Sequence, residues 1–92
     1  MRQRLPNRRM NETVELDFDG TTYAITVGLY PDGRPGEVFV HGSKVGSALD
    51  FLLDDASVLV SLLLQHGVAP RDLARSLGRG GVIAAVVGEL VA

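Results

Sequence analysis

The sequence predicts an α+β fold of two layers, in which a three-stranded antiparallel β-meander is followed by two or three α-helices. Two observations carry this prediction: apolar and polar residues alternate strictly over 13–18, and the apolar period lengthens to that of helices after residue 47. The 92 residues, 46% of them apolar and 22% charged, have the composition of an ordinary globular domain. We therefore expect a basic extended arm over 1–12 and a single domain over 13–92.

The first half of the chain contains a hairpin and a third strand. Asp19-Gly20 favours a type I′ two-residue turn. Folding about this turn pairs Leu16 with Tyr23 and places the large apolar side chains of both strands on one face. A second turn contains Pro31, whose fixed φ suits the first central position of a β-turn. The expected strands cover residues 13–18, 21–29 and 37–41.

Three helices are expected after the strands. Ser47 and Asp50 have the spacing of a capping box, and Gly67 is typical of the left-handed residue that ends a helix, so the main helix covers about 48–66. Pro70 suits the first turn of a second helix, which ends at residue 77. The apolar stretch over 82–91 predicts a short third helix.

Charge is distributed unevenly along a chain whose net charge is −2. Four arginines fall in the first ten residues, and the other five basic residues and all eleven acidic residues follow. An acidic body argues against a nucleic-acid-binding surface, and the arginine arm is expected to be a flexible, solvated tail. No apolar run is long enough to span a bilayer or to serve as a secretory signal, and cysteine is absent, so we expect a cytoplasmic protein.

The chain offers little for catalysis or metal binding. Its two histidines, His41 and His66, have no metal-ligand spacing in a sequence without cysteine. We expect His41 to be a solvated residue at a strand end and His66 to lie at a helix C-terminus, where the macrodipole favours its protonated form. No base and nucleophile are spaced as a catalytic pair. We therefore predict no catalytic, cofactor-binding or metal-binding residue.

One connection resembles an anion cradle, because it joins a strand to a helix N-terminus and carries glycines, hydroxyls and a lysine. It does not match the G-x-x-x-x-G-K-[ST] fingerprint. A structural loop with a serine cap is the favoured interpretation. Phosphate or nucleotide binding is the alternative, and its candidate residues are Gly42, Ser43, Lys44, Gly46 and Ser47.

The main helix has a narrow polar stripe, which we expect to be its solvated face. Asp55 lies outside this stripe, within the apolar arc, and is expected either at the rim of a buried surface or paired with Arg71 or Arg75. The stripe consists of Ser47, Asp50, Asp54, Ser57, Ser61 and Gln65.

The apolar arc of the same helix spans about 240°, whereas a helix packed on one sheet buries a stripe of somewhat more than 100°. The excess must meet either the segment 82–91 or a second copy of the chain. A homodimer is preferred, because a thin core gains from added burial and a twofold axis lets one patch satisfy itself. The candidate interface residues are Phe51, Leu52, Val58, Leu59, Leu62 and Leu63.

The run from Val27 to Val40, VGLYPDGRPGEVFV, resembles the TSCPD-type C-terminal domain of adenosylcobalamin-dependent (class II) ribonucleotide reductases. The similarity covers roughly residues 4–78. Further matching residues are Leu5-Pro6-Asn7-Arg8, Lys44, Gly46-Ser47, Leu52, Asp54, Ser61-Leu62, Leu64-Gln65 and Gly67-Val68.

This resemblance implies a link to deoxyribonucleotide synthesis. The reductases need a cysteine that becomes a thiyl radical and an oxidisable cysteine pair, and this chain has no cysteine, including in the motif that names the domain. The expected function is a non-catalytic interaction or oligomerisation module. Its partners would be a second copy, a ribonucleotide reductase or another protein.

Overall fold

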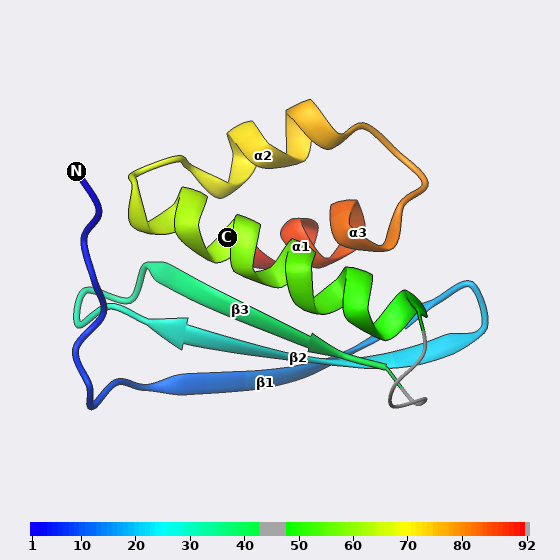
Figure 1. Cartoon of the computed structure of the whole chain (residues 1–92), viewed down its shortest axis with the longest axis horizontal. Helices are drawn as coiled ribbons and strands as arrows, with labels where there is room; N and C mark the ends of the chain where they lie inside the picture. The colour runs from blue at the N-terminus through cyan, green and yellow to red at the C-terminus, as the bar shows by residue number, and fades with distance from the viewer. Residues whose placement is uncertain (43–47, 92) are drawn as a thin grey trace.

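A computed structural model describes residues 1–42 and 48–91 of the chain. Within this part, three strands precede three helices: β1 (Asn11–Phe18), β2 (Thr21–Leu29), β3 (Pro35–His41), α1 (Ala48–Gln65), α2 (Pro70–Leu77) and α3 (Val82–Leu90). The sheet order is β1-β2-β3, and both neighbouring pairs are antiparallel. The helices lie on one side of this meander (Figure 1). The predicted two-layer α+β fold is confirmed.

The hairpin of β1 and β2 has the predicted turn and register. Asp19 and Gly20 both have positive φ, 51° and 79°, as a type I′ turn requires. Leu16 lies opposite Tyr23, as expected. Because side chains alternate between the faces of a strand, this register sends the apolar residues of both strands toward the helices.

The turn between β2 and β3 also follows its sequence signal. The Gly33 N–H donates a hydrogen bond to the Tyr30 carbonyl at 2.8 Å, which closes a four-residue turn with Pro31 at its first central position. Beyond the turn the pairing shifts by one residue, because Leu29 lies opposite Pro35 while Gly28 lies opposite Glu37. Gly36 is therefore the extra residue of a β-bulge.

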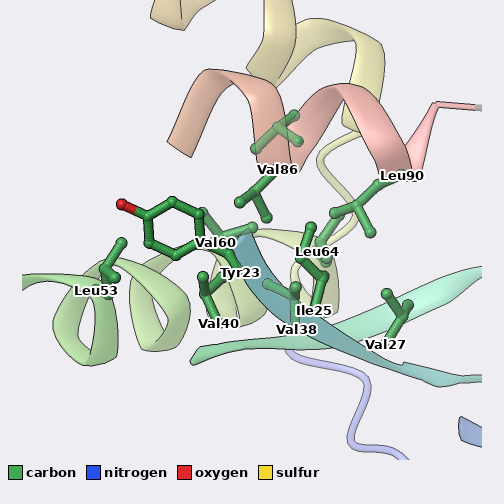
Figure 2. Close-up of a cluster of buried hydrophobic side chains, with 11 residues drawn as sticks. Tyr23, Ile25, Val27, Val38, Val40, Leu53, Val60, Leu64, Val86 and Leu90 are labelled. Carbon is green, nitrogen blue, oxygen red and sulfur yellow. The ribbon is translucent and has the colours of Figure 1, made fainter. Parts of the chain in front are cut away.

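One hydrophobic core joins the sheet to α1 and α3. In Figure 2, Val86 and Leu90 of α3 point toward side chains of α1 and the sheet. α2 adds only the partly buried Leu73 and Ala74. The buried core residues are Tyr23, Ile25, Val27, Val38, Val40, Leu53, Val60, Leu64, Val86, Val87 and Leu90.

The orientation of α1 differs from the prediction. The polar stripe faces the sheet over most of its length rather than solvent: Ser57 and Gln65 are only 3% and 6% exposed, and Ser61 is half-buried. Only Asp54 in the described part of the stripe is fully exposed, and Asp50 is half-buried. The predicted solvated face is therefore wrong for the serines and the glutamine.

The physical reason for this correction is the free edge of β3. The Val38 N–H donates to the Ser61 hydroxyl oxygen at 2.9 Å, and the Ser61 hydroxyl donates to the Val38 carbonyl at 3.2 Å. The Gln65 amide nitrogen donates to the Gly36 carbonyl at 3.0 Å. Backbone groups at a covered sheet edge need partners. α1 supplies them from the stripe in place of a fourth strand.

The C-terminal end of α1 agrees with its sequence signal, whereas the predicted Ser47 cap at its start lies outside the described residues. Gly67 has φ +91°, and the N–H groups of Gly67 and Val68 donate to the carbonyls of Leu64 and Leu63, both at 3.0 Å. This pattern is a Schellman motif. α2 has the predicted bounds, and α3 ends one residue earlier than expected.

α3 does not cover the excess apolar arc of α1. Val86, Val87 and Leu90 are directed into the shared core, whereas the large apolar side chains on the far side of α1 stay exposed. The expectation that 82–91 could cover this arc is therefore not met. No helix in the described part of the chain is long and apolar enough to cross a membrane.

Replacing Ser61 with alanine should lower the free energy of unfolding by about 1–2 kcal/mol, because two backbone groups of Val38 lose their partner at a covered edge. Urea denaturation followed by circular dichroism measures this change. Ser76→Ala is the matched control: the Ser76 hydroxyl donates to the Asp72 carbonyl within exposed α2, and its loss should cost less than about 0.5 kcal/mol. Equal effects of the two substitutions would contradict the proposed sealing of the strand edge.

Candidate functional site

The side of α1 that points away from the sheet carries a continuous set of exposed apolar side chains, which we call the outer face of α1. Five of the six predicted interface residues are 42–65% exposed, and Leu62 is half-buried. Leu49, which was not among the predicted interface residues, is also exposed. The exposed residues of the outer face are Leu49, Phe51, Leu52, Val58, Leu59 and Leu63.

Asp55 is the one charged residue within the outer face. It is exposed, and it forms no ion pair with any residue that the structure describes. Arg75 lies instead 4.0 Å from Asp72 within α2. Of the two expectations for Asp55, the ion pair with an α2 arginine is not found among the described residues, and a position at the rim of a buried surface stays a prediction. His66 is exposed just beyond the C-terminal end of α1.

A second feature is the N-terminal arm, residues 1–10, which forms no helix or strand but is attached to the domain. The Gln3 N–H donates to the Gln65 carbonyl at 2.7 Å, and the Arg2 Nε donates to the Gln65 side-chain oxygen. The Tyr30 hydroxyl donates to the Gln3 carbonyl. These contacts hold the arm against the end of α1 and the β2–β3 turn, where the sequence suggested a solvated tail.

The arm is also fixed by an ion pair. Arg9 donates from Nε and Nη2 to the two carboxylate oxygens of Glu37, with an Nη2–Oε1 distance of 3.2 Å, and from Nη1 to the Pro6 carbonyl. Glu37 is only 8% exposed and extends over Gly28, its cross-strand neighbour. A Cβ atom at Gly28 would collide with the Glu37 side chain. The missing side chain at Gly28 thus makes room for the buried carboxylate.

A cavity of about 450 Å³ lies between the arm and the β2–β3 turn. Most of its lining is apolar, and its charged residues are both arginines. We call it the arm cavity. Its lining residues are Pro6, Arg8, Arg9, Met10, Leu29, Tyr30, Pro31 and Gly33.

The turn beside the arm cavity is held by Asp32 and Arg34. The Arg34 backbone N–H and its Nε donate to the Asp32 carboxylate at 3.1 and 2.7 Å. These hydrogen bonds lower the pKa of Asp32 below its ordinary value. The Arg34 guanidinium also lies over the Tyr30 ring, 4.8 Å from its centroid. The turn is therefore braced by contacts among its own residues.

The loop considered as a possible anion cradle falls almost wholly outside the described residues. This applies to Ser43, Lys44, Gly46 and Ser47. Gly42 is half-buried, and a Cβ atom there would lie 3.6 Å from the Tyr23 ring. The structural interpretation of this loop therefore stays a prediction, and phosphate binding stays its alternative. In the described part of the chain no three His, Asp or Glu residues come together as metal ligands, and His41 is exposed at the end of β3.

Residues 2–86 match the model of the TSCPD domain. The chain belongs to this family. A vitamin B12-dependent ribonucleotide reductase of Rhodopirellula baltica is 40% identical over 67 residues, which cover 73% of this chain and 6% of the relative. The reductase of the same name in Agrobacterium fabrum is 36% identical over 67 residues, covering 73% of this chain and 5% of the relative. The reductase of the same name in Streptantibioticus cattleyicolor is 41% identical over 68 residues, which cover 74% of this chain and 11% of the relative.

The resemblance inferred from the Val27–Val40 run is thereby confirmed. This TSCPD chain spans only about a tenth or less of the length of these curated relatives. No solved structure matches the chain. The family match begins at residue 2, so it includes the arm that contacts Gln65, Tyr30 and Glu37.

Sequence reasoning missed the arm cavity and the attachments that build it. One signal was present, since Leu5-Pro6-Asn7-Arg8 belonged to the residues that carried the resemblance. Leu5 packs beside Gly36, where a Cβ atom would come within 2.9 Å of its methyl group. A shared pattern in an arm without secondary structure is best explained by contacts of this kind.

Arg9→Ala should destabilise the domain by about 1–3 kcal/mol, because it leaves the Glu37 carboxylate buried without its cation. Chemical denaturation measures the effect. Arg75→Ala removes an arginine from an ion pair on exposed α2 and should change stability by less than about 0.5 kcal/mol. If Arg9→Ala were as neutral as this control, the arm would not be held by the ion pair.

Proposed function

We propose that this TSCPD domain is a non-catalytic interaction module that pairs with a second copy through the outer face of α1 and acts as an accessory to a vitamin B12-dependent ribonucleotide reductase. The observation that carries the proposal is the exposed outer face itself. A set of large apolar side chains on one face of a folded domain is typical of an interaction surface.

The core of the domain is complete without the outer face. α1 buries Leu53, Val60 and Leu64 against the sheet, and its polar stripe satisfies the edge of β3. Phe51 and Leu59, on the other side of the same helix, are 62% and 63% exposed. Folding therefore does not require these side chains to be apolar. Contact with another molecule would explain why they are.

A second copy suits this face because a twofold axis brings equivalent residues together. Two antiparallel α1 helices that cross near Val58 and Leu59 would place apolar side chains against apolar side chains. Each Asp55 would lie between three and four residues from the crossing point, so the two carboxylates would be separated by about 10 Å along the helix axis. This separation keeps the two carboxylates out of direct contact, and dimerisation would have to leave each of them hydrated.

The link to a reductase rests on the family and on the relatives named above. Those relatives are called vitamin B12-dependent ribonucleotide reductases, and the chain matches only a small part of each. Because this chain has no cysteine, the thiol chemistry expected of the reductases is not available to it. A role beside a separate reductase, in deoxyribonucleotide synthesis, fits both facts.

Leu59→Gln should weaken dimerisation by about tenfold or more, since burying a leucine at an interface is worth roughly 1.5–3 kcal/mol. Sedimentation velocity over a range of protein concentrations measures the dimer constant. Leu77→Gln changes an exposed leucine of α2 and should leave that constant unchanged. A monomeric mass for the parent chain into the hundreds of micromolar would refute the dimer.

The purified chain alone should show no ribonucleotide reduction, and its addition should change the turnover of a separately purified vitamin B12-dependent reductase by at least about twofold. The change should saturate with added domain, because a specific complex has a fixed number of sites. Leu59→Gln serves as the test variant and Leu77→Gln as its control. Unchanged turnover at all concentrations would contradict the accessory role, and turnover by the chain alone would contradict its non-catalytic nature.

A further inference from the structure

We infer that the arm cavity binds a small organic anion, made of one compact apolar or aromatic group and one carboxylate or phosphate. This inference is independent of the proposed dimer, since the arm cavity and the outer face of α1 are formed by different elements. The arm cavity has a volume of about 450 Å³, which falls within the usual range of roughly 300–1,000 Å³ for small-molecule sites.

The apolar residues of the lining would contact the apolar group of such a ligand. Met10 and Leu29 belong to the junction of arm and sheet, and Pro6 and Pro31 come from the arm and the turn. Tyr30 completes this lining. Burial of an apolar group against these side chains would favour binding through the hydrophobic effect.

The two arginines of the lining are the candidate partners for the anionic group of the ligand, and they are not equivalent. Arg9 is neutralised by the buried Glu37 carboxylate. Arg8 is exposed at the surface of the cavity, and it makes no hydrogen bond or ion pair with any residue in the described part of the chain. None of the described residues that line the cavity is acidic. The site therefore has an uncompensated guanidinium, a group that binds carboxylate and phosphate with two parallel hydrogen bonds.

The wall formed by Tyr30 is prepared in advance. Its hydroxyl donates to the Gln3 carbonyl, and the Arg34 guanidinium lies over its ring. The adjacent backbone is held by the Gly33–Tyr30 hydrogen bond. A wall already fixed in place loses little conformational freedom when a ligand binds. This rigidity distinguishes the cavity from a gap beneath a loose arm.

The test uses the full chain and four probes in isothermal titration calorimetry: 1-naphthyl phosphate, 1-naphthoate, 1-naphthalenemethanol and inorganic phosphate. Saturable binding with one site per chain is expected for one or both of the aromatic anions. The neutral alcohol and inorganic phosphate should each bind at least about tenfold more weakly. The two aromatic anions distinguish a phosphate ligand from a carboxylate ligand.

Arg8→Gln should lower the affinity for the anionic aromatic probe at least tenfold, and Met10→Gln should lower it severalfold. Arg4→Gln is the matched control, because Arg4 is another exposed arm arginine that does not line the cavity. All three positions are exposed, so the variants should keep the circular dichroism and unfolding midpoint of the parent. Amide shifts in nuclear magnetic resonance should centre on the lining residues.

Three outcomes would overturn the inference. The first is the absence of saturable binding by either aromatic anion. The second is equal binding of the neutral alcohol or of inorganic phosphate, which would show that one half of the ligand suffices. The third is an equal effect of Arg4→Gln and Arg8→Gln, which would show general attraction to a basic arm rather than a site.

Discussion

The free edge of β3 is the constraint on which the rest of this structure depends. The Val38 backbone and the Gly36 carbonyl point toward α1, and Ser61 and Gln65 satisfy them. An edge covered without such partners would be costly, because each buried unsatisfied group loses its hydration. The need for hydroxyl and amide groups turns the polar stripe of α1 inward. The same rotation turns Phe51 and its neighbours outward, so edge sealing and the exposed apolar face have one cause.

Gln65 connects the sealed edge to the N-terminal arm. Its side-chain nitrogen donates to the Gly36 carbonyl, its side-chain oxygen accepts from Arg2, and its backbone carbonyl accepts from the Gln3 N–H. The Tyr30 hydroxyl donates to the carbonyl of the same Gln3 and so holds this residue from a second side. The arm that lines one side of the arm cavity is therefore anchored through Gln3 to the end of α1 and to Tyr30.

Local signals in the sequence were enough to predict most of the fold, because each acts within a few residues. Asp19-Gly20 determines the hairpin register, and Gly67 and Pro70 mark the boundary between two helices. The orientation of α1 could not be predicted in this way. Periodicity identifies a polar stripe, but the groups that Ser61 must satisfy belong to a strand 23 residues earlier. The stripe itself held a signal, since its central and C-terminal positions are serines and glutamine rather than charged residues.

The residues of the candidate interface could be predicted from the sequence, whereas those of the arm cavity could not. The physical basis of each surface explains this difference. An apolar excess is a property of one helix and can be counted from its sequence. The cavity requires Arg8 to lie beside Tyr30 and Pro31, although more than twenty residues separate them along the chain. Next to Arg8, Arg9 is held by Glu37, and Gly28 leaves room for that carboxylate. The ion pair of Arg9 with Glu37 therefore fixes the arm at the residue next to Arg8. Arg9 serves to attach the arm, whereas Arg8 keeps its guanidinium free of any partner in the described part of the chain.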